Sequence, residues 1–306
     1  MTRTIVIGAG PIGRASAESL LSRGHEVAVV TRSGTRPPGT DAFVADITLP
    51  GTASRLPDAG AILLCANFPY GTWHRDWPPA IATAIAAAER TGAVLVIAGN
   101  LYAYGPSAAP FTERDPLAAE YRNGKVRAEV WRRALAAHEA GRIRAVEVRG
   151  SDYIGADTGP GAHGGDRLLR PVLAGRPASI LGDPDQPHAW TSIDDFGRML
   201  ALAAEDERMQ GRPWHVPNAP ACSMRELARI ALRAAGLARE PGFRRLPRPL
   251  LRLLATFSPA MAGLRDAAYQ FDAPFLVDDS DARTILGLDH TPLATTIAAA
   301  VRALRR

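Results

Sequence analysis

The chain has 306 residues, of which 46% are apolar and 22% charged, and 36 basic against 31 acidic residues give a formal net charge of +5. This composition is typical of a globular protein with one large or two modest domains, and it excludes a wholly disordered or collagen-like chain. The basic residues are spread along the chain apart from a cluster over residues 244–252. We therefore expect a solvated basic surface and no nucleic-acid partner.

No apolar run is long enough to span a bilayer, and the first apolar segment follows the start of the chain too closely for a signal peptide. We therefore expect a cytoplasmic protein with no membrane partner. The two cysteines, Cys65 and Cys222, lack the paired spacing of a zinc site. We expect reduced thiols and no bound metal.

The first predicted elements form a strand, a glycine-rich turn, a helix and a second strand within about 30 residues. They are expected at Thr4–Ile7, Gly8–Gly13, Arg14–Arg23 and His25–Val30. This order is typical of a dinucleotide-binding site that opens a Rossmann domain.

Each glycine of the turn has a distinct expected role. Gly8 permits the tight turn, Gly10 lets the backbone approach a pyrophosphate, and Gly13 allows the helix to pack closely on the strand. Pro11 and Ile12 complete the turn, and the helix N-terminus would face the phosphates. The turn therefore predicts a bound dinucleotide.

The end of the second strand indicates which dinucleotide binds. An NAD site usually places a carboxylate there for the ribose 2′-hydroxyl, but the sequence reads Thr31, Arg32, Ser33. A guanidinium and two hydroxyls suit a 2′-phosphate. We expect NADP as the cofactor, with NAD as the alternative.

The first half of the chain continues to alternate between strands and helices. Further strands are expected at 42–45, 61–65, 93–97 and 143–148, and helices at 80–90 and 117–139. This pattern predicts a doubly wound parallel α/β sheet, whose ligands gather at the carboxyl ends of the strands. Ala66 and Asn67 follow the fourth strand and Asn100 the fifth, so we assign them to the site.

Tyr121 and Lys125 are the strongest candidates for chemistry. At a spacing of four residues on a helix, a phenol and an amine share one face. An ammonium favours the phenolate, so the tyrosine can exchange a proton with an alcohol or carbonyl substrate. Lys125 is also the only lysine, beside 35 arginines. Gly124 weakens a helix there, so the alternatives are a tyrosine at the helix start and an ordinary surface tyrosine.

Motifs in order along nearly the whole chain resemble the extended short-chain dehydrogenase/reductases, the NAD(P)-dependent epimerase/dehydratase family. They are the glycine turn, Asp46, Tyr104–Pro106, Tyr121-x-x-x-Lys125, Arg149, Leu181–Asp183, Ile193–Asp195 and Asp279–Arg283. The resemblance implies that Asp46 lies by the adenine and that Tyr121 and Lys125 are the catalytic pair. It also implies a Rossmann domain at 1–158, with returning segments near 186–217, and a smaller C-terminal substrate-binding lobe, mainly 159–306.

Two residues depart from the family pattern. Asn100 stands where the family usually has serine or threonine; its amide can donate to a substrate oxygen but cannot relay a proton in the same way. His188 stands about where sugar-nucleotide enzymes often carry an arginine for the diphosphate, which disfavours such a substrate. His188 is a substrate contact, a second proton donor or a structural histidine. Further candidate substrate contacts are Tyr102, Tyr104 and Trp190.

These features predict an NADP-dependent oxidoreductase or epimerase that transfers hydride at a carbonyl or alcohol centre of a small molecule. Tyr121 is the expected general acid/base, Lys125 binds the ribose as well, and Asn100 donates to the substrate oxygen. The alternative is a catalytically weakened NAD(P)-binding regulator or scaffold, which Asn100 favours and the single lysine disfavours. A homodimer is a further expectation.

Overall fold

The computed structural model describes residues 3–159 and 161–305, and these divide into two compact units. The first unit runs up to Gly105 and includes Pro116–Arg149 and Phe196–Trp214. The second comprises Pro106–Asp115, Gly150–Asp195 and the chain from His215 onwards. Residues 106–115 and 150–158 therefore lie in the second unit, although the expected Rossmann range of 1–158 included them.

The first unit is built on a sheet that has seven strands within the described residues, in the order β10-β6-β5-β4-β1-β2-β3. Its strands are β1 (Arg3–Ile7), β2 (Glu26–Thr31), β3 (Asp41–Val44), β4 (Ala61–Leu64), β5 (Val94–Asn100), β6 (Arg144–Gly150) and β10 (Pro213–His215). Its helices are α1 (Pro11–Ser22), α2 (Thr52–Arg55), α3 (Trp73–Thr91), α4 (Arg122–Glu139) and α6 (Ile193–Ala203), with short 3-10 turns η1 (Tyr70–Thr72), η2 (Leu101–Ala103) and η3 (Glu207–Met209). Strands β1 to β5 pair in parallel, which confirms the predicted doubly wound α/β fold.

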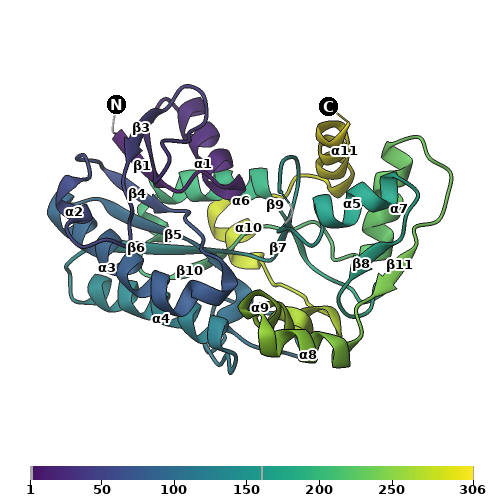
Figure 1. Ribbon diagram of the computed structural model, residues 1–306. Helices are drawn as coiled ribbons and strands as arrows, with labels where there is room; N and C mark the ends of the chain where they lie inside the picture. The colour runs from purple at the N-terminus through teal and green to yellow at the C-terminus, as the bar shows by residue number, and fades with distance from the viewer. Residues whose placement is uncertain (1–2, 160, 306) are drawn as a thin grey trace. The chain divides into compact units, whose positions relative to one another are not determined.

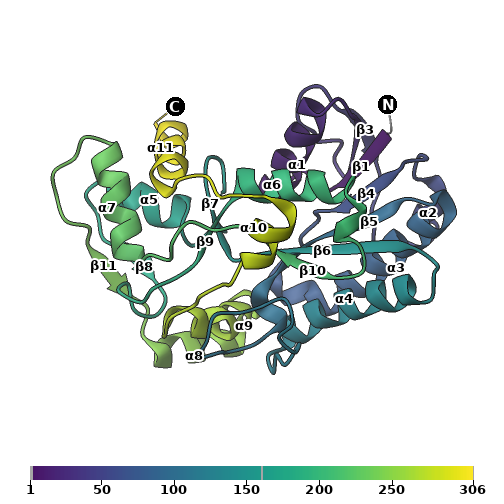
Figure 2. The same ribbon diagram turned by 180° about the vertical axis from the view of Figure 1, so that it is seen from behind.

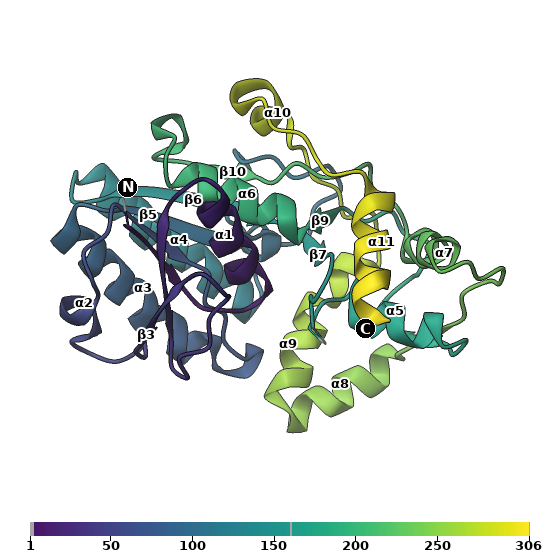
Figure 3. The same ribbon diagram turned by 90° about the horizontal axis from the view of Figure 1, so that it is seen from above.

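Helices cover both faces of this sheet (Figures 1 and 2). Helices α3 and α4 pack together on one face, where buried Trp77 and Trp131 belong to a core with Ile62 and Leu95 of the strands. On the other face α1 and α6 lie side by side (Figure 3), and a Cβ at Gly197 would lie 2.5 Å from the Ala15 backbone. The sheet is therefore buried on both sides, as its continuous apolar strands require.

Two helices begin at other residues than the sequence predicted. α3 begins at Trp73 and not at Ala80, and Pro78 and Pro79 lie inside it. The buried Trp73 and Trp77 rings hold this added turn against the core and outweigh the unfavourable prolines. α4 begins at Arg122 and not at Leu117.

The second unit has its own core and two small parallel sheets. Its strands are β7 (Asp152–Ile154) with β9 (Trp190–Ser192), and β8 (Ala178–Ile180) with β11 (Phe243–Arg245). Its helices are α5 (Asp166–Leu173), α7 (Met224–Ala234), α8 (Arg248–Phe257), α9 (Pro259–Ala267), α10 (Ser280–Leu286) and α11 (Leu293–Leu304), with η4 at Ala268–Phe271. Apolar side chains of α5, α7 and α11 pack with those of β8 in this core.

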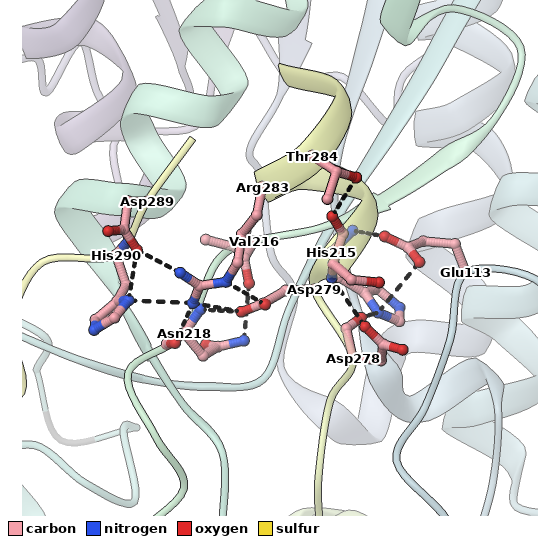
Figure 4. A network of polar contacts seen from close by, with 11 residues as sticks. Glu113, His215, Val216, Asn218, Asp278, Asp279, Arg283, Thr284, Asp289 and His290 are labelled. Atoms are coloured by element: carbon pink, nitrogen blue, oxygen red, sulfur yellow. Dashed lines mark hydrogen bonds and ion pairs between the residues drawn. The ribbon is translucent and has the colours of Figure 1, made fainter. Parts of the chain in front are cut away.

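A network of polar contacts fixes α10 in the second unit (Figure 4). Arg283 donates to Asp279 through Nε (2.7 Å) and to the Asn218 carbonyl through Nη2 (2.8 Å), and it also pairs with Asp289. The His215 backbone N–H donates to Glu113 (3.0 Å). The Asp279–Arg283 motif therefore has a structural use, because its arginine ties segments far apart in sequence.

Candidate active site

The glycine turn after β1 is closed to side chains at two positions. Gly8 has φ = 105°, and its N–H donates to the Val30 carbonyl at 2.9 Å. A Cβ at Gly8 would lie 2.8 Å from the Ala66 backbone, and one at Gly13 would lie 2.0 Å from the Gly8 carbonyl oxygen. Only glycine lets β1, β4 and α1 approach one another this closely.

The first turn of α1 fits a phosphate group. Gly10 is the N-cap and Pro11 opens the helix, with no acidic residue in the first turn and no side chain capping it among the described residues. A Cβ at Gly10 would meet no protein atom within 4 Å. The space beside Gly10 is therefore open, and a helix N-terminus at this place suits the pyrophosphate of a dinucleotide.

The hydroxyls after β2 are engaged within their own turn. The Thr31 hydroxyl donates to the Thr35 carbonyl (3.0 Å), and the Ser33 and Thr35 hydroxyls lie 2.8 Å apart. The Arg75 guanidinium, hydrogen-bonded to Asp76, holds the pKa of that carboxyl below its usual value, and the charge of Arg32 adds to this effect. Arg32 itself is exposed directly after the end of β2.

Two further predicted cofactor contacts make local hydrogen bonds. The Asp46 carboxylate accepts from the backbone N–H and the hydroxyl of Thr48 (2.9 and 2.7 Å). The Asn67 carbonyl oxygen accepts from the Phe68 N–H (3.0 Å). These bonds fix both loops at the carboxyl ends of β3 and β4, on the same edge as the glycine turn.

Asn100 is the last residue of β5 and the N-cap of η2. Its Oδ1 accepts from the Tyr102 backbone N–H at 3.1 Å. Because this bond settles which end of the amide is the carbonyl, the Nδ2 group is the end that can donate elsewhere. A donor at the carboxyl end of a central strand suits a substrate carbonyl or a developing oxyanion.

Aromatic side chains surround the end of β5. The Tyr102 ring stacks on Trp73 with centroids 6.0 Å apart, and its hydroxyl lies 2.7 Å from that of Tyr70. Phe68 meets Trp77 edge-on at 5.2 Å. Sequence analysis did not single out Tyr70 or Phe68, although their place directly after β4 was a signal that could have found them.

Tyr121 lies just before α4 and not within it. It has extended backbone angles as the N-cap residue, and its carbonyl accepts from the Lys125 N–H at 3.0 Å. Its side chain is 41% exposed, and Lys125 is exposed as well. The expected arrangement on one helix face is therefore wrong, and the alternative of a tyrosine at the helix start is correct.

Gly124 explains why the helix starts here. A Cβ at Gly124 would lie 2.5 Å from both the Tyr102 carbonyl oxygen and the Ala119 Cβ. The glycine that weakens the helix in isolation thus lets its first turn lie directly on η2. This contact fixes the segment that carries Tyr121 and Lys125 relative to the one that carries Asn100 and Tyr102.

A buried charge cluster supports this arrangement. Arg149 donates to Glu147 (2.7 Å) and to the Tyr104 hydroxyl (2.6 Å), and all three side chains are buried. Arg127 of α4 donates to the Ala98 carbonyl of β5 (2.8 Å) and lies 3.6 Å from Glu147. The cluster therefore ties α4, β5, β6 and Tyr104 together.

Burial and neighbouring charges act in opposite directions within this cluster. Burial lowers the pKa of Arg127 to about 10, although the charge of Glu147 opposes the effect. Burial also lowers the pKa of Arg149, but Glu147 and Tyr104 outweigh it and leave the value raised. Sequence analysis missed Glu147 and Arg127. Charges alternating with Val146 and Val148, in a strand expected to be buried on both faces, were the available signal.

His188 lies in the core of the second unit, among aromatic rings. Its imidazole stacks between Phe271 (4.9 Å) and Phe275 (5.1 Å) and lies 4.4 Å from Trp190. Nδ1 faces the Gln270 carbonyl oxygen at 3.2 Å and Nε2 faces Asp152 at 2.9 Å.

Both ring nitrogens of His188 face oxygen atoms of the protein, the Gln270 carbonyl oxygen and the Asp152 carboxyl group. Burial would raise the pKa of Asp152, but the hydrogen bond with His188 and the charges of His163 and His188 outweigh it and lower the value. Asp152 is therefore held as a carboxylate, and both ring nitrogens of His188 have their partners within the protein.

Metal binding, thiol chemistry and a membrane span find no support in residues 3–159 and 161–305. No three His, Cys, Asp or Glu side chains gather there as a metal site would require. Cys65 and Cys222 are free and buried, and burial raises the pKa of each thiol to about 12. None of the helices in these ranges combines the length and apolar character that crossing a membrane needs.

Comparison with known proteins agrees with this geometry. The sequence model described as the NAD dependent epimerase/dehydratase family matches residues 4–216. Search of the curated protein sequences found no match.

Solved structures match the chain over almost its full length. They include MoeE5 in complex with UDP-glucose and NAD, with 21% identity and a TM-score of 0.78, covering 99% of both chains. Thermus thermophilus UDP-glucose 4-epimerase in complex with NAD has 19% identity and a TM-score of 0.79, covering 99% of both. Bacillus cereus UDP-glucuronic acid 4-epimerase in complex with UDP-glucuronic acid and NAD has 16% identity and a TM-score of 0.80, covering 99% of both. At these identities the matches establish the fold.

Substitutions at two glycines of the turn test folding stability and cofactor binding separately. Gly10→Ala should change the free energy of unfolding by less than about 1 kcal/mol, because its Cβ meets no protein atom. It should weaken NADPH binding at least about tenfold, because the methyl group enters the space next to the helix N-terminus. Gly13→Ala should cost about 3 kcal/mol of stability. Urea denaturation and NADPH fluorescence titration measure both effects, and unchanged NADPH affinity in Gly10→Ala would contradict the phosphate assignment.

The His188–Asp152 pair predicts a pH-dependent stability. Asp152→Asn should lower the free energy of unfolding by roughly 3 kcal/mol at neutral pH. The folded-state pKa of Asp152 lies below the unfolded value of about 3.9, so its contribution is complete above that pH and is lost as the pH falls through the folded-state value. The difference in free energy of unfolding between wild type and variant should therefore shrink below about pH 4. Urea denaturation across pH measures it, with Asp58→Asn on the surface as control; a difference that stays constant into acid would refute the pair.

Proposed function

The chain belongs to the NAD dependent epimerase/dehydratase family, and we propose that it is an NADP-dependent oxidoreductase or epimerase acting on a carbonyl or alcohol centre of a small molecule. The observation that carries this proposal is the glycine turn, where Gly8 and Gly13 bring β1, β4 and α1 into contact and leave the helix N-terminus open. The family and the turn together support a nucleotide cofactor.

We assign the reaction to side chains at the carboxyl edge of the sheet. When bound, the nicotinamide supplies or accepts a hydride. The Asn100 Nδ2 group donates to the substrate oxygen and stabilises negative charge on it. Tyr121 gives a proton to that oxygen or takes one from it, and the Lys125 ammonium favours the phenolate and binds the ribose. The exposure of the Tyr121 side chain leaves it accessible to substrate.

The remaining assignments are proposals of the same kind. The backbone of Gly8 to Gly13 binds the pyrophosphate, and Asp46, Ala66 and Asn67 lie beside the cofactor. Tyr102 faces the substrate, whereas Tyr104 acts through the buried Arg149 to position the end of β5. The substrate-binding role of the second unit, a homodimer and a cytoplasmic location stay predictions.

A second candidate is an enzyme acting on sugar nucleotides, because the matched structures hold UDP-sugars. His188 does not favour it, since its two ring nitrogens already face Asp152 and the Gln270 carbonyl oxygen. An assay with UDP-glucose, UDP-glucuronic acid and small carbonyl compounds, with NADPH or NADP, separates the two. Turnover of a UDP-sugar would assign the substrate to the sugar nucleotides, and turnover of the small carbonyl compounds alone would exclude that class.

Arg32 predicts a preference between the two cofactors. Arg32→Ala should weaken NADPH binding about tenfold or more and leave NADH binding unchanged, because a guanidinium recognises the 2′-phosphate. Fluorescence titration measures both, with Arg36→Ala, also exposed in this loop, as the control. Equal losses for NADPH and NADH would show that Arg32 does not read the phosphate.

Substitution of Lys125 on α4 tests whether the chain is an enzyme or a cofactor-binding regulator. Tyr121→Phe and Lys125→Arg should each lower turnover by about a hundredfold or more while the protein stays folded, because each removes a group required for proton transfer. Arg122→Lys, also exposed on α4, is the matched control and should keep full activity. Circular dichroism verifies folding. If Lys125→Arg alters only NADPH affinity, the chain is a cofactor-responsive regulator.

A further inference from the structure

Helix α8 presents an apolar stripe to solvent. Leu250, Leu253, Leu254 and Phe257 are 43%, 57%, 38% and 82% exposed. Their spacing of three and four residues places them on one side of the helix. Large apolar side chains are exposed together here over one continuous helical face, and such a patch marks an interaction surface.

The stripe is a fixed feature of the second unit. Leu251 and Ala255 of the same helix are buried, and Leu251 belongs to the core of this unit. Helix α9 packs alongside α8 (Figures 1 and 3), and the Ser258 hydroxyl caps its N-terminus by accepting from Met261. The helix is therefore anchored by one face and exposes the other.

The surroundings of the stripe are basic. Residues 241–265 contain five arginines and no acidic residue. Arg245 pairs with Asp183 and Arg248 with Asp272, whereas Arg244 and Arg252 are exposed with no ion pair among the described residues. A helix with leucine and phenylalanine on one face and arginine on another has the character of a helix that lies in a membrane interface.

The small area of the stripe favours a membrane surface over a protein partner. Covering four side chains of a ten-residue helix removes only a few hundred Å² from water, whereas a stable protein interface needs about 800 Å² from each partner. A bilayer surface requires no shape complementarity. The helix is about 15 Å long and the hydrocarbon core about 30 Å thick, so α8 would lie in the plane of the surface.

We propose that α8 docks this protein on an anionic membrane surface, with Leu250, Leu253, Leu254 and Phe257 inserted among the acyl chains and Arg244 and Arg252 at the headgroups. This departs from the expectation of no membrane partner, which rested on the absence of a spanning segment. The arginine cluster, expected to be a plain solvated face, then supplies cations to the headgroups from both β11 and α8. The proposal is independent of the enzymatic function.

Cosedimentation of the full-length protein with vesicles tests the proposal. Wild type should bind vesicles of equal parts phosphatidylglycerol and phosphatidylcholine at least about tenfold more strongly than phosphatidylcholine alone, and added salt should weaken this binding. The double variant Leu253→Asp/Phe257→Asp should lose at least about tenfold in binding. Arg244→Ala/Arg252→Ala should lose a similar factor on the anionic vesicles, because each arginine contributes about fivefold.

Leu49→Asp is the matched control, because Leu49 is also 57% exposed but lies in the first unit; it should bind vesicles like wild type. Circular dichroism verifies that each variant folds. The proposal is overturned if wild type does not bind anionic vesicles, or if the double variant binds them as wild type does. A fall in oligomer mass in the double variant, without vesicle binding by wild type, would assign the stripe to a second copy of the chain instead.

Discussion

The contact between α1 and the end of β1 is the constraint on which the cofactor site depends. A Cβ at Gly13 would lie 2.0 Å from the Gly8 carbonyl oxygen, and one at Gly8 would lie 2.8 Å from the backbone that follows β4. With both side chains absent, α1 starts directly at the ends of β1 and β4. Parallel pairing places the carboxyl ends of β2, β4 and β5 along one edge of the sheet, so the residues assigned to cofactor and substrate share it.

The segments that carry Asn100 and Tyr121 lie at the same edge and depend on a second close contact, between α4 and η2. Gly124 lets α4 lie on η2, and Arg127 joins the same helix to the Ala98 carbonyl of β5. Glu147 lies between Arg127 and Arg149, so a carboxylate neutralises one of two buried guanidiniums. Removing it would leave two like charges in a low dielectric, which is far costlier than the pair itself is stabilising. The positions of Asn100 and Tyr121 therefore depend on charges that never touch a substrate.

The sequence predicted the parts of the structure whose cause is local. The strand–glycine–helix pattern after Thr4 and the alternation of strands and helices were enough for the sheet and for the turn, because periodicity and glycine placement report directly on backbone geometry. The starts of α3 and α4 were predicted wrongly because contacts between distant segments decide them. Trp73 and Trp77 gain enough by burial to carry a helix through Pro78 and Pro79, and the first turn of α4 packs on η2 at Gly124. The charges of β6 could be noticed from their alternation with valines, but their partner Arg127 lies on α4, so no local pattern reveals the pairing itself.

His188 is a buried polar side chain whose ring nitrogens both face partners within the protein. Sequence analysis left His188 open as a substrate contact, a second proton donor or a structural histidine. Its two nitrogens face a carboxylate and a carbonyl oxygen, and its ring stacks on two phenylalanine rings. These contacts join β7, β9 and the segment around Phe271 and favour the structural role. A substrate that binds the second unit, as proposed, would therefore have to be recognised by groups other than the ring nitrogens of His188.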